Sequence, residues 1–526
     1  LALGGVMLAI VALGAVLVPF VGRDFFPSVD AGQIRLHVRA PSNLRIEETE
    51  RLFQRVESEI RAEIPANEID QIIDNFGRFE GINMAFRDTA NLGPFDGEVL
   101  VSLQPGHAGA TEDYVKELRE RLPAALPGVT FYFQPADIVT QILNFGLPAP
   151  IDVQVTGPNR DANFAAAKRI EKRIADVPGI VDAHVHQVID APRLHFEVDR
   201  ARALERGLGQ RDVANNVLVT LSGTAQVQPA YWVDPATSRN YLITTQTPQL
   251  TMASVEDLAT MPISTPSGDA VLLGDLATLS RKSTPVNITH ANVQPCFDVY
   301  AAVQGVDLGS VEAPLRAVIA EELKTLPPGS KIELRGQIDS MRLAFSRLLI
   351  GIVLAGLLVY FLMVVNFQSW LDPFIIILAL PGALAGIALA LFATHTTFNV
   401  PSLMGTIMCI GVATSNSILV VTFANQRRLA GDDALTAALA AGRTRLRPVL
   451  MTALAMIVGM LPMSLGIGEG GEQNAPLGRA VIGGLVLATA TTLVFVPVVY
   501  TLLRRTAPKF LGSEADEAHA EGLVTT

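Results

Sequence analysis

The chain has 526 residues, of which 49% are hydrophobic and 17% charged, and its mean hydropathy is +0.36. These values exclude an ordinary soluble enzyme, and 42 Gly and 32 Pro without a short repeat exclude a collagen-like or disordered chain. Two cysteines, Cys296 and Cys409, are too few for a disulfide framework and too far apart for a zinc site. The composition therefore predicts a membrane protein with a large water-exposed part.

The net charge of −11 is confined to residues 1–347, because the nine basic and nine acidic residues after Arg347 cancel each other. An acidic, water-exposed region of this size argues against nucleic acid as a partner. The rest of the chain is expected to be membrane-embedded, apart from a disordered cytoplasmic tail over 510–526.

An apolar stretch over 1–21 opens the chain and ends before Arg23. A signal peptide is the alternative interpretation, but the stretch has no basic leading region and no convincing cleavage site before Arg23. We therefore predict a first transmembrane helix over 1–21. Because the sequence lacks an initiator methionine and starts within apolar residues, we expect it to be a piece of a longer polypeptide.

Strand–helix–turn–strand units recur through the acidic region. The first unit has an alternating strand over 33–40 and an amphipathic helix over 46–64, and Pro-Gly turns follow the helices of three later units. A Pro-Gly pair is also a common helix stop, but its recurrence at the same point favours a repeat. Four units predict two ferredoxin-like (split βαβ) subdomains, and the gap between the last two predicts an inserted domain. The expected bounds are 31–137 for the first subdomain, 138–185 with 286–342 for the second, and 186–285 for the insertion.

Five apolar stretches follow Arg347, and each can span a bilayer without an internal Asp, Glu, Lys or Arg. They are 348–365, 373–392, 400–424, 448–465 and 480–503, which predicts a five-helix bundle over 348–503. Arginines in the loop 424–447 and after residue 503 define the cytoplasmic side by the positive-inside rule. Both termini are then cytoplasmic and 22–347 lies outside. The predicted fold class is an α+β membrane protein with six transmembrane helices and a large periplasmic domain.

Several motifs together resemble the C-terminal half of a resistance–nodulation–division (RND) permease of the type that exports hydrophobic and amphiphilic compounds. The resemblance runs from residue 1 to about residue 509, and the motifs lie at 25–33, 45–50, 367–373 with Pro381, 445–452, and Gly483-Gly484 with Pro497-Val498. It implies a proton-driven homotrimer in the lipid bilayer of a bacterial inner membrane. The implied partners are the missing N-terminal half, a periplasmic adaptor (membrane fusion) protein and an outer-membrane channel. The two subdomains would be porter modules, and 186–285 a docking (funnel) domain.

The resemblance also implies a proton relay. The family carries its proton-binding aspartates in the half that this chain lacks, and a lysine on the tenth span faces them. Ser415 stands in place of that lysine, so that Ser415 and Asn416 can relay hydrogen bonds but supply no positive charge. Arg445 and Thr452 match relay residues on the eleventh span and, seven residues apart, lie on one helical face. The alternatives are helix packing for Ser415 and Asn416, and interfacial anchoring for Arg445.

One group of aromatic and methionine residues suits the binding of varied apolar ligands, although it suits a buried core equally well. It lies between the two units of the first subdomain and comprises Phe76, Phe79, Met84, Phe86 and Phe95. His184 and His186 share one face of a strand and could bind a metal, but a pair of packed histidines is the preferred interpretation. No catalytic triad or nucleotide-binding loop is present. We therefore expect neither enzymatic activity nor a cofactor or bound metal.

The favoured function is export of amphiphilic or hydrophobic compounds by proton antiport within a tripartite efflux complex. One alternative is a protein-translocation accessory subunit, which shares the six spans but has a smaller external loop. A second alternative is a heavy-metal exporter of the same superfamily. That exporter would be expected to show a methionine cluster in the cleft and charged residues along the spans.

Overall fold

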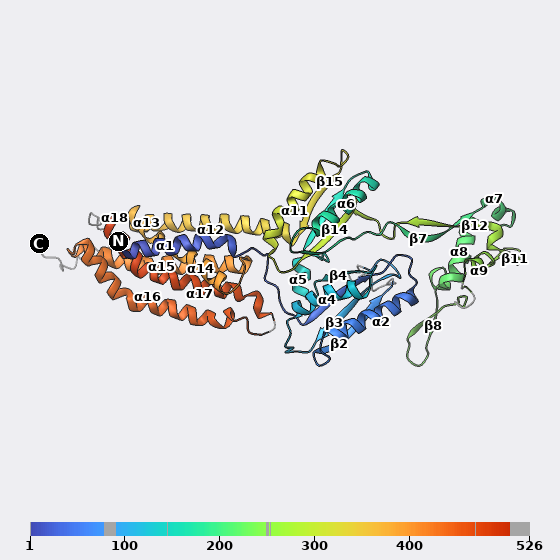
Figure 1. Ribbon diagram of the computed structural model, residues 1–526, viewed down its shortest axis with the longest axis horizontal. Coiled ribbons are helices and arrows are strands. Elements are labelled where there is room, and N and C mark those ends of the chain that lie inside the picture. Colours follow the sequence, from blue (N-terminus) through green and yellow to red (C-terminus); the bar gives the residue numbers. More distant parts are fainter. Residues whose placement is uncertain are drawn as a thin grey trace. The chain divides into compact units, whose positions relative to one another are not determined.

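The computed structural model describes residues 2–77, 91–144, 146–248, 252, 254–468 and 470–504 (Figure 1). The predicted tail over 510–526 lies outside these residues. The chain divides into two compact units, one formed by Leu1–Gln187 with Ile288–Thr526 and the other by Val188–Asn287. The first unit contains two β-sheets and a bundle of apolar helices.

The first sheet has four antiparallel strands in the order β2-β3-β1-β4. Its strands are β1 (Gln33–Arg39), β2 (Ile69–Phe76), β3 (Asp96–Leu103) and β4 (Thr130–Gln134), and helices α2 (Ile46–Glu63) and α4 (Thr111–Ala125) pack against it. Helix α2 buries Leu52, Phe53, Val56 and Ile60, which recur at helical spacing on one face. Burial of these side chains fixes the helix on the sheet, at roughly 1.5–3 kcal/mol for each fully buried residue.

The second sheet has five strands that come from both sides of the Val188–Asn287 unit. Strand β5 (Ile151–Thr156) is buried at every position and pairs with β14 (Gln294–Val303), with Val153 opposite Val299. The remaining strands are β6 (Ile180–Val185), β13 (Thr289–Ala291) and β15 (Lys331–Gly336), and the packed helices are α6 (Arg160–Ala175) and α11 (Leu308–Leu323). The chain before and after residues 188–287 therefore forms a single sheet.

The Val188–Asn287 unit has its own small core, built from Ala203, Leu208, Val213, Met261, Ile263, Leu273, Leu276 and Ala277. Strands β7 (Ala191–Val198) and β12 (Ala277–Thr284) form an antiparallel ribbon that enters and leaves it. The other elements are α7 (Arg200–Glu205), α8 (Gln210–Ser222), α9 (Val255–Ala259), α10 (Leu273–Leu276), the β8–β9 hairpin (Ala230–Val233 and Asn240–Ile243), and β10 (Pro262–Ser264) with β11 (Ala270–Leu272).

The apolar helices begin with α1 (Ala2–Leu17), which is shorter than each of the five spans that follow and packs on α14. Five longer spans follow, each long and apolar enough to cross a membrane. They are α12 (Gln337–Phe367), α13 (Leu371–Ile377) with α14 (Leu380–Ala393), α15 (Val400–Leu429), α16 (Ala434–Ser464), and α17 (Ala475–Ala490) with a π-helical turn (Thr491–Phe495) and α18 (Val496–Leu503). The sixth transmembrane helix, over 1–21, stays a prediction.

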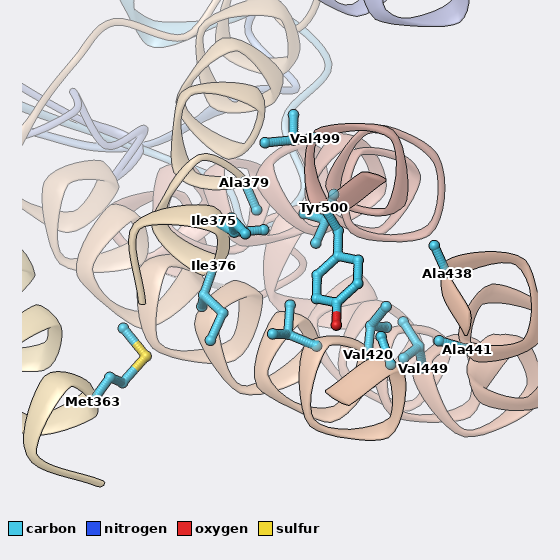
Figure 2. Packing of buried hydrophobic residues seen from close by; sticks show 13 residues of the cluster. Met363, Ile375, Ile376, Ala379, Val420, Ala438, Ala441, Val449, Val499 and Tyr500 are labelled. Atoms are coloured by element: carbon cyan, nitrogen blue, oxygen red, sulfur yellow. The ribbon is translucent and has the colours of Figure 1, made fainter. Parts of the chain in front are cut away.

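Small residues let helices α14 and α17 approach closely. A methyl group added to Gly386 would lie 2.4 Å from the carbonyl oxygen of Gly483, and one added to Gly483 would lie 2.1 Å from Cβ of Ala390. Close contact of this kind is typical of helices packed within membranes. There, van der Waals packing holds the helices together, because the hydrophobic effect does not act between them in lipid. Around Tyr500 the bundle also packs larger side chains, among them Ile375 and Ile376, as Figure 2 shows.

Candidate functional site

Two of the four predicted relay residues meet between helices α15 and α16. The Thr452 hydroxyl donates to Asn416 Oδ1 at 3.1 Å, and Asn416 is buried. Thr452 also lies within hydrogen-bond distance of the Pro448 and Val449 carbonyl oxygens of its own helix. The hydroxyl of Thr452, an exposed residue, can therefore exchange its acceptor between the two helices.

Ser415 lies away from this pair. Its side chain is on the exposed face of α15, which also carries Met404, Met408 and Leu419. Neighbouring residues on an α-helix point about 100° apart, so that burying Asn416 turns Ser415 outward. Within the described chain, Ser415 is thus available to a partner but does not join the Asn416–Thr452 contact.

Arg445 also lies apart from the pair, because residues 445 and 452 are separated by roughly 10 Å along one helix. Its guanidinium carbon is 4.9 Å from the centre of the Phe423 ring on α15. The arrangement is a cation–π contact, which favours a partly desolvated cation. The structure therefore supports an anchoring contact for Arg445, whereas its relay role remains a prediction.

Sequence reasoning missed a second polar contact, in the centre of the bundle. The Ser417 and Thr492 hydroxyls are 3.0 Å apart and buried, and Thr492 lies in the π-helical turn. Such turns occur often at functional positions because they displace the backbone and its carbonyl oxygens. The adjacent residues Thr491 and Thr492 were the available signal, but hydropathy gives no sign of a π-helical turn.

A buried ion pair at one end of the bundle was also missed. Asp372 at the start of α13 is 3.2 Å from Arg504, the residue after α18, and only 2% and 10% of their side-chain surfaces are exposed. Beside them, the Tyr500 hydroxyl donates to Asn425 Oδ1 at 2.7 Å. Figure 2 shows the Tyr500 ring among the apolar side chains of α13, α15, α16 and α18. The sequence places Asp372 in a loop, and the partner 132 positions later gives no local signal.

The predicted aromatic site is described only in part, since Phe79, Met84 and Phe86 lie outside the described residues. The Phe76 ring centre is 5.0 Å from that of Phe53 on helix α2, and Phe95 is buried. Phe76 therefore packs against helix α2 and Phe95 is buried, which supports the core interpretation for these two residues.

His184 and His186 lie in the contact between the two sheets. The His184 ring stacks on Tyr132 at 3.8 Å, and Tyr132 stacks on His37 at 4.4 Å. Arg39 donates to the carbonyl oxygens of Val185 and His186. Burial and the nearby Arg39 charge lower the pKa of His184 well below its usual value and that of His186 to about 3. The pair is neutral and packed at pH 7, and no group of three or more His, Cys, Asp or Glu side chains among the described residues could hold a metal.

Two open cavities in the described part of the first unit have polar linings. One, of about 370 Å³, lies over the first sheet and is lined by Arg35, Glu98 and Gln141 among others. The other, of about 590 Å³, is lined by residues that include five carboxylates and two arginines, namely Asp24, Asp30, Glu112, Asp137, Glu472, Arg35 and Arg119. Burial raises the pKa of Asp24, whereas hydrogen bonds from Thr111 outweigh burial and lower that of Asp30. The larger cavity is hence acidic and favours cations.

The model of the AcrB/AcrD/AcrF family matches residues 2–504. The chain belongs to this family of RND transporters. The family's members are transporters and not enzymes, and the five long apolar helices agree with a multi-pass membrane protein.

Named relatives cover nearly the whole chain. It is 27% identical to the cobalt-zinc-cadmium resistance protein CzcA of Cupriavidus metallidurans, over 92% of this chain and 45% of that protein. Identity to the nickel and cobalt resistance protein CnrA of the same organism is 28%, over 98% and 48%. Identity to the multidrug resistance protein MdtC of Proteus mirabilis is 25%, over 94% and 46%.

Solved structures give the same picture of the fold. A crystal structure of a heavy metal efflux pump superposes with a TM-score of 0.81 at 24% identity, covering 96% of this chain and 50% of that chain. A second crystal form of a heavy metal efflux pump gives 0.80 at 25% identity, with the same coverage. The chain spans about half the length of the relatives it matches.

Proposed function

We propose that this chain is the C-terminal half of a proton-driven RND exporter of heavy-metal cations. The observation that carries the proposal is the similarity to CzcA and CnrA over 92% and 98% of the chain, since both proteins are named for resistance to such cations. The same similarity favours metal export over the export of amphiphilic compounds that the sequence motifs suggested.

The acidic cavity supports a cationic substrate. Five carboxylates and two arginines leave an excess of negative charge, which raises the local concentration of cations by electrostatic focusing. Carboxylates alone bind divalent cations loosely, whereas tight binding of Zn²⁺ or Cd²⁺ would require imidazole or thiolate ligands. We therefore propose that the cavity attracts cations and passes them on, and that it is not a storage site.

The bundle supports proton coupling through neutral relays. Asn416 with Thr452 and Ser417 with Thr492 can reorient hydrogen bonds without an ionised group, and Arg445 supplies a nearby cation. The titrating carboxylates would belong to the other half of the permease, against which the exposed face around Ser415 would pack. Removing the Arg445 charge should then impair coupling more than removing the Ser415 hydroxyl.

We further propose the assembly that RND pumps typically form, with a trimer in the bacterial inner membrane joined by a periplasmic adaptor and an outer-membrane channel. The two sheets would be porter subdomains and the Val188–Asn287 unit a docking domain. Residues 22–347 would then lie in the periplasm, and the end of the bundle with Asp372 and Arg504 would face the cytoplasm.

Export of amphiphilic compounds is the second candidate. It is favoured by the 25% identity to MdtC and by the cavity over the first sheet, which has both polar and apolar lining residues. Amphiphilic ligands require such mixed surfaces.

Uptake assays in vesicles with an imposed pH gradient test the proposal, using the permease that contains this chain. We expect Zn²⁺, Co²⁺ or Cd²⁺ transport that a protonophore abolishes, with a KM that rises in Glu112→Gln, which lines the acidic cavity. Glu117→Gln is the matched control on the same helix α4, away from the cavity lining. Transport of amphiphilic dyes without metal transport would instead establish the second candidate.

A further inference from the structure

The short segment 22–25 follows the first apolar helix and pairs with a distant loop of the chain. The Asp24 N–H donates to the Phe398 carbonyl oxygen at 2.9 Å, and the Phe398 N–H donates to that of Gly22 at 3.1 Å. The Val400 N–H also donates to the Phe25 carbonyl oxygen at 3.2 Å. These three bonds attach the segment to the loop between helices α14 and α15 and to the first residue of α15.

The same segment caps helix α11 of the second sheet. The Asp307 carboxylate accepts the N–H groups of Ser310 and Arg23 through one oxygen, at 3.0 Å and 2.9 Å. The Gly309 N–H donates to the Arg23 carbonyl oxygen at 2.8 Å, and the Leu308 N–H donates to the Asp24 carboxylate at 2.8 Å. The first N–H groups of a helix have no partner within it, so segment 22–25 supplies partners that α11 would otherwise lack.

Two glycines permit this close approach. Gly22 has φ +76°, and a methyl group added to it would lie 3.0 Å from the carboxyl carbon of Asp307. A methyl group added to Gly309 would lie 2.9 Å from Cβ of Arg23. Neither position has room for a side chain without a shift of its neighbour, and only glycine adopts the Gly22 conformation freely.

Further along, Asp30 makes a third connection. Its N–H donates to the Glu472 carboxylate at 2.8 Å, in the loop between α16 and α17, while its own carboxylate accepts from Thr111 at the start of α4. Residues 22–30 therefore contact two loops of the helix bundle and one helix from each sheet.

We propose that residues 22–25, together with Asp307 and Gly309, form a joint that stays closed throughout export and carries movements of the membrane bundle to helix α11. The role of this joint in export rests on the proposed function, whereas its hydrogen-bond geometry is independent of it. Six hydrogen bonds, four of them between backbone groups, connect three parts of the chain over a few residues, and such a connection moves as one body. Asp307 and Asp24 are its positioning residues.

A cross-link tests whether the joint stays closed. The double variant Arg23→Cys with Gly309→Cys places two Cβ atoms about 2.9 Å apart, so that a shift of under ~1 Å reaches disulfide geometry. Native Cys296 and Cys409 are buried, so they do not compete for the oxidant. We expect rapid disulfide formation, and export by the oxidised form within about twofold of the reduced form. Loss of export on oxidation, restored by a reductant, would show that the joint opens in each cycle.

Removal of the link tests whether the joint transmits movement. The Asp307→Ala variant should lose most of its export activity. The Asp307→Asn variant keeps an accepting oxygen and should retain export. Asp199→Ala is the matched control, because Asp199 likewise caps a helix, α7 in the other unit, by accepting the N–H groups of Ala201 and Arg202. Full export by Asp307→Ala would overturn the proposal.

Amide hydrogen exchange distinguishes an error in the proposed joint from an error in the proposed function. In Asp307→Ala, the amides of Arg23, Gly309 and Phe398 should exchange faster, whatever the transported compound. Unchanged exchange, or no disulfide in the cysteine pair, would refute the joint itself. Normal cross-linking and exchange effects in a permease that exports no metal would refute only the proposed substrate.

Discussion

The membrane bundle and the two extramembrane sheets both bury polar side chains, but they compensate them differently. Two side-chain contacts between helices of the bundle join neutral groups, Asn416 with Thr452 and Ser417 with Thr492, and the ion pair Asp372–Arg504 lies at one end. The sheets bury ionisable groups in their centres. The difference indicates that a buried charge is tolerated in this fold where an opposite charge or a proton compensates it.

The two sheets also differ from each other. In the first, burial is outweighed by His37 and Arg39, which lower the pKa of Asp96. In the second, burial and the neighbouring Asp298 raise the pKa of Asp152 to about 8, and its Oδ1 has no hydrogen-bond partner among the described residues. In the first sheet, positive charge thus compensates the buried, ionised carboxylate of Asp96. In the second sheet, the carboxyl group of Asp152 is compensated by keeping its proton.

The largest expected effect concerns this proton. The pKa of Asp152 is 3.8 when unperturbed and about 8 in the fold, so the folded state binds more protons than the unfolded state between these values. Stability should therefore fall as pH rises from about 4 to 8, by up to about 1.4 kcal/mol per pH unit. Asp152→Asn should flatten this dependence and be more stable than the parent at pH 8, as measured by thermal unfolding in detergent. Asp176→Asn, at the exposed end of α6, is the control and should leave the slope unchanged.

The next effect concerns the buried ion pair. Asp372→Asn leaves the Arg504 charge buried without its counter-ion, which should destabilise the bundle by about 3 kcal/mol. The matched control is Asp432→Asn, which breaks the more exposed pair with Arg427 and should cost less than about 1 kcal/mol. Equal shifts in melting temperature for the two variants would show that the Asp372–Arg504 pair is solvated.

A smaller effect is expected in the bundle centre. Ser417→Ala removes the contact with Thr492 between α15 and α17 and should cost about 0.6–1 kcal/mol, in the range measured for hydrogen bonds between membrane helices. Thr414→Ala deletes a buried hydroxyl that donates to the Ile410 carbonyl oxygen of its own helix, and should cost less. The comparison fails if the two melting temperatures fall equally.

The smallest effect is expected at Ser415. Because its side chain is exposed, Ser415→Ala should change the stability of this chain by less than about 0.5 kcal/mol. The neighbouring substitution Asn416→Ala removes the hydrogen-bond partner of Thr452 and should lower the stability of the chain by more. A larger loss for Ser415→Ala in thermal unfolding would place Ser415 inside the bundle.

Hydropathy predicts where the chain crosses a bilayer but not how far its helices extend. Helix α12 begins at Gln337 and α16 at Ala434, whereas the apolar stretches begin at 348 and 448. The additional turns carry four arginines, Arg342, Arg347, Arg443 and Arg445. Their charges end an apolar stretch, but arginine is a good helix former, so the helix continues through them. The spacing of apolar residues likewise predicts the strands and helices, because strands and helices each depend on residues that are close in the sequence.

Contacts across the chain could not be predicted in this way. The grouping of Asn416 with Thr452 came from a family resemblance, and the structure brings the two together but leaves Ser415 and Arg445 outside the contact. Asp372 with Arg504, and Tyr500 with Asn425, are joined only by helix packing. The stacked rings of His37, Tyr132 and His184 require two sheets to meet, which no local pattern encodes.

The π-helical turn at Thr491–Phe495 sets the angular phase of the last span. A π-turn accommodates one residue more than an α-helical turn, and each residue of an α-helix accounts for about 100° of rotation. A regular α-helix formed by the same residues, without the wide turn, would turn α18 by that angle relative to α17. Tyr500 and Arg504 would then point away from Asn425 and Asp372, while Ser417 kept its neighbour. The π-helical turn therefore decides whether the three polar contacts of this span can exist together.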